Sequence, residues 1–426
     1  MPGFRSVPRT GVIYVMHRAY EKGFERNRSA WSNLGQGAPE CGPLPGGPPR
    51  RESLVIPPDQ HEYGPIGGIE ALRQRVADFY NNAYRRGRTS KYSAENVSIA
   101  PGGRAAMTRL AASLGEINMG HFIPDYTAYE ELLSTFKAFV PIPILRGARS
   151  GYQVSREELT REIVGRGLSA LLFSNPCNPT GQLVEGEQLD AWIDLARECR
   201  CTFILDEFYS HYIYSSKDAA SSNPAEHGTD EVRMVSAAEF IDDVNQDPVV
   251  IVDGLTKNWR YPGWRLSWVL GPRSIIEQVN SAGSFLDGGP NHPFQREALE
   301  LLDPELTRQE TRAIQREFGR KRQYMIDRLR EMDIQIEAEP SGSFYVWANL
   351  SRLRPPLNDG MTFFERGLDE QVITVPGSFF DVNPGRRRAH ARYEGHTRFS
   401  FGPAQAELER GLDAIGRLVE RPSVQD

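Results

Sequence analysis

The sequence predicts an α/β protein in which helices cover both faces of a mostly parallel central sheet, followed by a smaller α+β domain. Two observations support this fold class. Short, continuous apolar runs alternate with helical stretches through the middle of the chain, which is typical of buried parallel strands. After about residue 305 the pattern changes to one long charged helix and several strand-like segments. The length of 426 residues is sufficient for two such domains.

The amino-terminal part of the chain is rich in proline and glycine. Segments such as APECGPLPGGPPRR predict that the first 60 residues or so form an extended arm with little helix. The pattern becomes helical from Ile69, because Ile69, Leu72, Val76 and Phe79 recur on one face of the segment GIEALRQRVADFYNNAYRRG.

Four pairs of helical and apolar segments then predict the central sheet. NVSIA leads into the helix PGGRAAMTRLAASLG, and SREELTREIV precedes SALLFS. The helix SREELTREIV begins with a capping box formed by Ser155 and Glu158. EQLDAWIDLAREC precedes TFILD, and SAAEFIDDV precedes VVIVD. Ligands of such sheets bind at the carboxyl ends of the strands, so the loops that follow these strands are the places to search for chemistry.

The carboxyl-terminal part predicts the second domain. ELTRQETRAIQREFGRKRQYMIDRLREM is expected to form one long helix that bridges two domains, and FYVWANL, VITVPGSFF and RFSFG are expected strands. We therefore expect an arm over residues 1–55 that is part of the small domain, a large domain over 56–304 and a small domain over 305–426. The polar stretch 215–229 is expected to be a solvated loop.

Composition argues against several classes of protein. Lys and Arg total 50 against 56 Asp and Glu, a formal net charge of −6, so no basic excess points to nucleic acid. No apolar run approaches the roughly 20 residues of a membrane helix. The four cysteines fit neither a zinc spacing nor a disulfide framework, so we expect no metal site and a cytoplasmic protein.

Polar residues follow several of the predicted strands. FILDEFY places Asp206 at a strand end with Tyr209 three residues later, and VVIVDGLTKNWRYPGWR places Lys257 and Arg265 beyond another. SNPCNPTG places asparagines in a turn, and PGGRAAM places glycines where a strand meets a helix whose free N–H groups can bind an anion. Each feature alone has an ordinary structural explanation, such as a capped turn or a solvated lysine.

Together these features predict a site for pyridoxal 5′-phosphate. The aldehyde of this cofactor needs an amine, its ring nitrogen a carboxylate and its phenolic oxygen hydrogen-bond donors, while its phosphate needs an arginine and a helix amino terminus. Each requirement has a candidate at a strand end. Lysine is rare in this chain, which has only six, so few residues could supply the amine.

The motifs resemble those of the class I/II aminotransferases, which are fold-type I pyridoxal-phosphate-dependent enzymes. The signatures are NPxNPTG, the D-x-x-Y step and the spacing from Lys257 to Arg265, and the resemblance extends from NLGQG to RFSFG. It implies a three-layer α/β/α large domain. It also implies an enzyme that converts an amino acid to a 2-oxo acid through an internal aldimine at Lys257.

The resemblance implies roles for individual residues. Lys257 is expected to bind the cofactor and move the substrate proton, Asp206 to pair with the ring nitrogen, and Tyr209 to donate to the phenolic oxygen. The full set of implied cofactor contacts is Gly103, Arg104, Tyr126, Asn178, Asp206, Tyr209, Thr256, Lys257, Arg265 and Tyr63. Tyr126 is expected against the ring face, and Arg265 on the phosphate.

The same resemblance implies substrate contacts and a homodimer. Arg398 of HTRFSFG corresponds to the arginine that binds the substrate α-carboxylate, with Gly37 and Asn175 nearby. Tyr63 of HEYGPIGG corresponds to a tyrosine that reaches the phosphate of the neighbouring subunit, which implies shared sites. No second arginine can be placed at a side-chain carboxylate, so specificity for dicarboxylic amino acids is not expected.

The sequence departs from the family motif at one position, and several alternative functions remain open. The family often has Ser three residues before the lysine, where this chain has Gly254, and the hydroxyl of Thr256 is an alternative phosphate contact. Other pyridoxal-phosphate reactions (elimination, decarboxylation, cyclisation or oxidation of an amino acid) share the same fold. A ligand-sensing regulator is disfavoured by the acidic charge. A hydrolase is disfavoured because GxSxG and HExxH motifs are absent.

Overall fold

The computed structural model describes residues 11–214 and 232–421, and the loop expected at 215–229 lies outside them. The larger of its sheets has seven strands in the order β2-β8-β7-β6-β5-β3-β4. The pairs from β7 to β4 are parallel, whereas β8 is antiparallel to both of its neighbours. The strands are β2 (Val97–Ala100), β3 (Asn118–Ile123), β4 (Val140–Leu145), β5 (Leu168–Ser174), β6 (Thr202–Asp206), β7 (Val249–Gly254) and β8 (Ser267–Leu270).

Helices cover both faces of this sheet, because successive residues of its strands point to opposite sides. Ala170 and Leu172 of β5 pack with helices of one face, and Leu171 and Phe173 with those of the other. The first face carries α3 (Gly103–Ser113), α4 (Ala128–Thr135) and α7 (Arg273–Leu286). The second carries α2 (Glu70–Tyr84), α5 (Arg156–Arg166), α6 (Gly186–Cys199) and α8 (His292–Leu301). The predicted α/β class is therefore confirmed.

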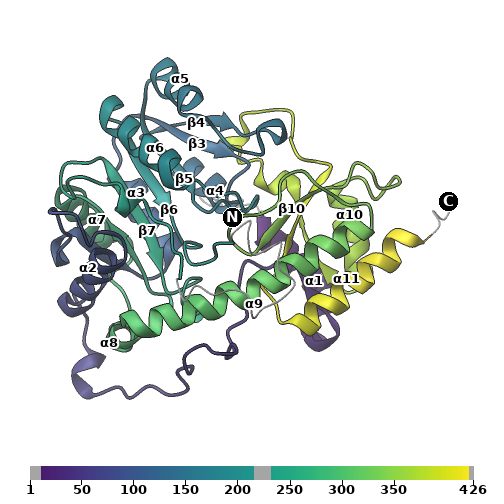
Figure 1. The fold of residues 1–426 in the computed structure, drawn as a ribbon, viewed down its shortest axis with the longest axis horizontal. Helices are drawn as coiled ribbons and strands as arrows, with labels where there is room; N and C mark the ends of the chain where they lie inside the picture. Colours follow the sequence, from purple (N-terminus) through teal and green to yellow (C-terminus); the bar gives the residue numbers. More distant parts are fainter. Residues whose placement is uncertain (1–10, 215–231, 422–426) are drawn as a thin grey trace, which may run out of the picture.

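A smaller four-stranded sheet has the order β12-β13-β10-β9. Its strands are β9 (Gln335–Ile336), β10 (Tyr345–Asn349), β12 (Val375–Pro376) and β13 (His396–Ser400), and α10 (Gly360–Asp369) and α11 (Gln405–Glu420) lie beside it (Figure 1). The amino-terminal arm joins this part of the molecule, because β1 (Ser32–Asn33) pairs in parallel with β11 (Val372–Ile373).

The long helix α9 (Pro304–Glu331) runs past both sheets, as Figure 1 shows. Near its beginning, Glu310 accepts a hydrogen bond from Arg260, which follows β7 in the chain. Near its end, Arg322 donates to the carbonyl of Pro340 at 2.6 Å, between β9 and β10. The predicted long bridging helix is thus confirmed, and its bounds agree with the sequence pattern to within a residue.

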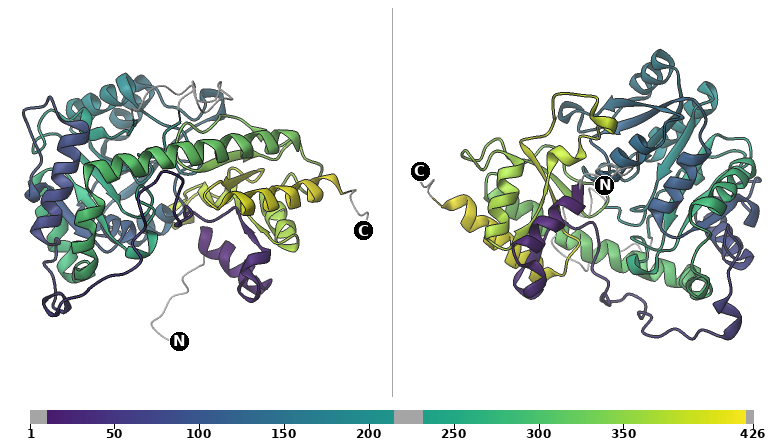
Figure 2. Two further views of the ribbon diagram at one scale, coloured as in Figure 1. Left: turned by 60° about the horizontal axis from the view of Figure 1, so that its bottom comes forward. Right: turned by 180° about the vertical axis from the view of Figure 1, so that it is seen from behind.

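Two expectations about helices are wrong. The arm contains an 11-residue helix, α1 (Gly11–Glu21), which lies against α10 through the Arg18–Glu365 ion pair (Figure 2). The segment 236–244 forms only a short 3-10 turn instead of the expected helix. The buried guanidinium of Arg85 donates to the carbonyls of Ala238 and Ile241, so these oxygens are already bonded outside any α-helical pattern.

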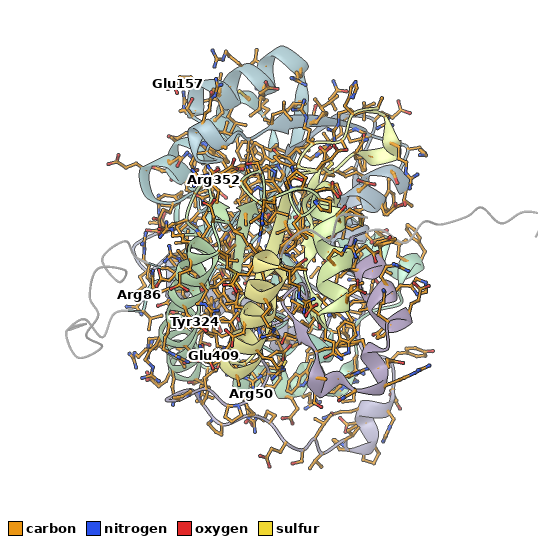
Figure 3. All side chains as sticks on the ribbon, turned by 90° about the vertical axis from the view of Figure 1, so that its right-hand side faces the viewer. Arg50, Arg86, Glu157, Tyr324, Arg352 and Glu409 are labelled. Atoms are coloured by element: carbon orange, nitrogen blue, oxygen red, sulfur yellow. The ribbon has the colours of Figure 1, made fainter. Side chains whose placement is uncertain are left out.

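The expected strand VITVPGSFF is also different in the structure, where it forms the two short strands β11 and β12 followed by a 3-10 turn at Gly377–Phe380. Charged side chains such as Glu157 of α5, Glu409 of α11 and Arg86, in the turn after α2, project from the outer surface of the molecule (Figure 3). Within residues 11–214 and 232–421, no helix has the length and apolarity to cross a bilayer.

Candidate active site

The carboxyl ends of β5, β6 and β7 bring the predicted polar residues to one edge of the large sheet. Ser174 pairs with Asp206, and Asp206 with Val252, so these parallel strands end together. Ser267 at the beginning of β8 pairs with both Gly254, at the end of β7, and Ala100, at the end of β2. The turn carrying Lys257, the segment before β8 and the first turn of α3 therefore meet at this edge.

Lys257 lies in the turn after β7, and its Nζ donates a hydrogen bond to the carbonyl of Gly37 from the arm. Burial lowers the pKa of Lys257 to about 7, and the positive charges of Arg265 and Arg398 act in the same direction. A large fraction of this amine is consequently neutral at physiological pH, the state needed for attack on an aldehyde or removal of a proton.

Asp206 ends β6 and is buried. The hydroxyl of Tyr129 donates to its Oδ2 at 2.8 Å. Burial raises the pKa of Asp206 to about 6, while the Tyr129 hydrogen bond and the charge of Lys257 oppose this rise. A buried carboxyl with this pKa is sensitive to any further positive charge, such as a protonated ring nitrogen, which would keep it ionised.

Tyr209 follows Asp206 by three residues, and its hydroxyl lies 2.8 Å from that of Tyr345 in β10. Both tyrosines are buried. Burial and the neighbouring Tyr345 raise the pKa of Tyr209 well above its ordinary value, so it is a neutral hydrogen-bond donor at physiological pH.

The first turn of α3 and Arg265 form a site that suits a phosphate group. The guanidinium of Arg265 lies directly against Gly102, where a Cβ would collide with it, and Gly102 has φ 98°. Gly103 begins the helix, and its first N–H groups have no acceptor within the helix. The hydroxyl of Thr256 is buried and lacks a hydrogen-bond partner. The combination of an arginine, free N–H groups and a hydroxyl is typical of phosphate sites.

The departure at Gly254 has a structural reason. A Cβ at Gly254 would lie 2.5 Å from Oγ of Ser267, the first residue of the paired strand β8, and 2.6 Å from the carbonyl of Leu266, the residue before that strand. The serine hydroxyl of β8 thus occupies the space that a side chain at position 254 would need.

Arg398 of β13 extends from the small sheet toward these residues. Its Nη1 donates to Oδ1 of Asn178 at 2.8 Å and its Nη2 to the carbonyl of Gly35 at 2.5 Å. Its Cζ lies 4.1 Å from the ring centroid of Tyr345. The Nε atom is buried without a partner. This fixed and incompletely satisfied guanidinium is suited to a carboxylate ligand.

Tyr126 and Arg104 lie beside each other at the edge of the site. Nη2 of Arg104 is 3.5 Å from the hydroxyl of Tyr126, whose half-buried ring packs edge-on against Tyr129 with centroids 5.5 Å apart. Tyr126 is thus connected through Tyr129 to Asp206.

Asn175 and Tyr63 are two predicted site residues whose side chains make no described contact with the other site residues. Both ends of the Asn175 amide bond the backbone of Val184, at 2.8 and 2.9 Å, so this side chain holds the turn after β5, and its contact with the substrate stays a prediction. Tyr63 is fully exposed on the extended segment that leads to α2, and it makes no contribution to the site of its own chain.

Three residues that contribute to the site, Tyr129, Gly35 and Tyr345, were not predicted from the sequence. Tyr129 is the second tyrosine of PDYTAY, so the motif itself contained the signal. Gly35 lies within NLGQG, but it contributes a carbonyl, which no residue type reveals. Tyr345 had no signal, because its place depends on the pairing of β10 with β13.

Comparisons with known proteins match this chain to one family and one fold. Residues 31–415 match the family model described as aminotransferase class I and II. An aspartate aminotransferase of Streptomyces avermitilis is 26% identical over 85% of this chain and 82% of its own. An aspartate/prephenate aminotransferase of Thermus thermophilus is 25% identical over 84% of both chains. The aspartate aminotransferase of Thermus thermophilus with maleate has a TM-score of 0.76 at 22% identity, covering 97% and 100% of the two chains.

The fold and the family match define the protein as a fold-type I α/β enzyme. The chain belongs to the class I and II aminotransferases. The predicted family, fold class and enzyme class are thereby confirmed, and amino acids and 2-oxo acids are the substrates of this class of enzyme.

The residues at the site fit pyridoxal phosphate. Lys257 offers an amine, Asp206 a buried carboxylate and Tyr209 a neutral hydroxyl. At the other end, Gly102 leaves room for Arg265 beside the amino terminus of α3, and Thr256 has an unpartnered hydroxyl. Each functional group of the cofactor thus has a complementary group in the described part of the chain.

Proposed function

We propose that this aminotransferase uses pyridoxal phosphate held by Lys257 and converts an α-amino acid to its 2-oxo acid. The observation that carries the proposal is that a lysine of lowered pKa in the turn after β7 and a buried aspartate at the end of the adjacent strand β6 lie close enough for their charges to affect each other. The bound cofactor supplies an aldehyde that condenses with amines and a ring that accepts the electron pair released at the substrate α-carbon.

The chain's own residues bind, orient and move protons. The Lys257 amine, once released, would take the proton from the substrate α-carbon and deliver it to the cofactor carbon that carried the aldehyde. Asp206 holds the proton on the ring nitrogen, and Tyr209 donates to the phenolic oxygen. Arg265, Thr256 and the N–H groups of Gly103 and Arg104 bind the phosphate.

Arg398 binds the substrate α-carboxylate in this proposal. Its fixed position, held by Asn178 and Gly35, and its unpartnered Nε support this role. The charges of Arg265 and Arg398 both lower the pKa of Lys257, and each of these guanidinium groups has a proposed ligand. Relatives are named for aspartate, but we assign no arginine of this chain to a side-chain carboxylate and propose a substrate with one carboxylate.

A half-reaction without an acceptor tests the proposal. Stoichiometric protein loaded with pyridoxal phosphate is mixed with single amino acids that include alanine, phenylalanine and aspartate. Conversion of the cofactor to its amine form together with an equimolar 2-oxo acid is expected, most rapidly with a monocarboxylic substrate. Uptake of oxygen, or release of carbon dioxide or ammonia, would instead indicate another pyridoxal-phosphate reaction on this fold.

We also propose a homodimer with shared sites, in which the arm over residues 1–55 belongs to the small domain and residues 56–304 hold the cofactor. The complete exposure of Tyr63, with Val55 82% exposed nearby, supports a partner surface on this segment. The partner's phosphate site is the proposed destination of Tyr63.

Mixing two inactive variants tests the shared site. Lys257→Ala and Tyr63→Ala proteins are unfolded together and refolded as a mixture. Each mixed dimer contains one site with both native residues, so activity should reappear on mixing. Activity that stays at the level of the separate variants would contradict a shared site.

A further inference from the structure

Tyr345, the first residue of β10, contacts groups from both sides of the site. Its ring lies 4.1 Å from Cζ of Arg398, and its hydroxyl lies 2.8 Å from that of Tyr209. The side chain is completely buried. Tyr345 therefore connects the proposed carboxylate-binding arginine with the proposed donor to the cofactor.

The pairing of β10 with β13 holds the ring beneath the guanidinium. Tyr345 pairs with Ser400 and Trp347 pairs with Arg398, so Tyr345 and Arg398 are diagonal neighbours on one face of the small sheet. Phe380 lies 4.9 Å from the same guanidinium carbon. A guanidinium held against aromatic faces loses rotational freedom, which prepares it for a planar ligand.

The hydroxyls of Tyr345 and Tyr209 form a hydrogen bond in which either oxygen can be the donor. Burial raises the pKa of Tyr345 to about 12, so both phenols keep their protons at neutral pH. When Tyr209 donates to an acceptor, its oxygen is free to accept from Tyr345. Consecutive hydrogen bonds of this kind polarise and strengthen one another.

Gly37 provides the space for this arrangement. A Cβ at Gly37 would lie 2.8 Å from the Tyr345 hydroxyl oxygen, closer than real contacts allow. The carbonyl of the same glycine accepts a hydrogen bond from Lys257. The Tyr345 hydroxyl is consequently close to the lysine that anchors the cofactor in the proposed function.

On the basis of the proposed function, we propose that Tyr345 is a positioning residue with two separable roles. Its ring orients Arg398 for the substrate α-carboxylate. Its hydroxyl donates to Tyr209 and so directs the Tyr209 proton to the phenolic oxygen of the cofactor.

Two substitutions separate these roles. Tyr345→Phe removes the hydroxyl and keeps the ring, whereas Tyr345→Leu removes both. Tyr214→Phe is the matched control, because Tyr214 is also buried, lies near an arginine and donates its hydroxyl to a backbone carbonyl, that of Ser343 at 2.7 Å. For each protein, the visible absorption of the bound cofactor is titrated with pH, and KM and kcat for the amino acid are measured.

In both Tyr345 variants, Tyr209 should donate a weaker hydrogen bond to the phenolic oxygen of the cofactor, so the anionic form of that oxygen becomes less stable. The midpoint of the pH titration of the cofactor's visible absorption should therefore move to higher pH. For Tyr345→Phe we expect an upward shift of about half a pH unit with KM nearly unchanged. For Tyr345→Leu we expect the same shift and a KM roughly tenfold higher, because the ring no longer supports Arg398. Tyr214→Phe should match the wild type.

Three results would each contradict a different part of this account. A Tyr345→Phe titration that coincides with those of the wild type and Tyr214→Phe would overturn the role of the hydroxyl. An unchanged KM in Tyr345→Leu would overturn the role of the ring. A wild-type protein that takes up no pyridoxal phosphate would refute the proposed function itself, and this result is recognisable before any variant is examined.

Discussion

The two sides of the site are built in different ways. The side that belongs to the large sheet uses residues at the carboxyl ends of adjacent strands, with Asp206 as the last residue of β6 and Lys257 in the turn after β7. The side that belongs to the small sheet uses Arg398, Tyr345 and carbonyls of the arm, which are far apart in the sequence and meet through side-chain contacts. The first side depends on sheet topology alone, and the second on the docking of three separate segments.

Because the two sides hold different groups, substitutions on them should affect different kinetic constants. A change on the large-sheet side removes a group that acts on the cofactor, so it should affect turnover most. A change on the small-sheet side alters how a carboxylate is held, so it should affect apparent substrate affinity. The following substitutions test whether the two sides differ in this way, with turnover affected on one side and apparent substrate affinity on the other.

The largest effect is expected for Lys257→Ala. Loss of the amine removes both the cofactor anchor and the proton carrier, so the visible band should disappear and turnover should fall by about 10⁴-fold or more. Absorption spectra and a transamination assay measure both quantities. The control is Lys137→Ala, since Lys137 is exposed and bonds the carbonyl of Ser134. A normal visible band in Lys257→Ala would contradict the assignment.

Asp206→Asn should retain cofactor but lose roughly 10²-fold in kcat, because a neutral amide no longer favours the protonated ring. The comparison protein is Asp253→Asn. Asp253 is also buried, one residue before the end of β7, but its carboxylate bonds Asn258 and Tyr80 instead of the site. If both variants lose the same activity, the loss reflects damage to the sheet and the role of Asp206 is not supported.

Arg398→Lys should raise the KM of the amino acid roughly tenfold and change kcat less. A lysine keeps the charge but cannot bind a carboxylate, Asn178 and Gly35 with one planar group. Steady-state kinetics with Arg410→Lys as the control measure this effect, since Arg410 bonds the carbonyl of Trp31 away from the site. A loss confined to kcat would break the proposed distinction between the two sides.

The smallest effect concerns stability without cofactor. Because the pKa of Asp206 is raised from 3.8 to about 6, the native protein binds its proton more tightly than the unfolded chain does. The destabilisation from this carboxyl therefore develops as pH rises from about 4 to 6 and is complete above that. Cofactor-free Asp206→Asn should be more stable than wild type at pH 8 by roughly 1–3 kcal/mol and equally stable at pH 4, measured by urea unfolding. A pH-independent difference would contradict this assignment of the pKa.

The large-sheet side of the site could be predicted from sequence patterns, whereas the small-sheet side largely could not. The ends of β5, β6 and β7 could be located because buried parallel strands are continuous apolar runs, and polar residues after them stand out. Arg398 and Gly37 were identified only through family motifs. Tyr345 could not be found, because its place is decided by the register of two strands about 50 residues apart in the chain.

Two further differences between the predicted and observed elements also depend on the surrounding structure. The strand β4, VPIPIL, contains Pro141 and Pro143, which argue against a strand except at a sheet edge, where β4 lies. The expected helix over 236–244 is prevented by Arg85, more than 150 residues away, whose guanidinium bonds its carbonyls. Local patterns do not contain such long-range contacts.

The most direct test of the central claim is to identify the residue that carries the cofactor. Wild-type protein loaded with pyridoxal phosphate is treated with borohydride, which makes the lysine linkage permanent, and its peptides are analysed by mass spectrometry. The account predicts one modified residue per chain, Lys257. Modification at another lysine, or none at all, would contradict it.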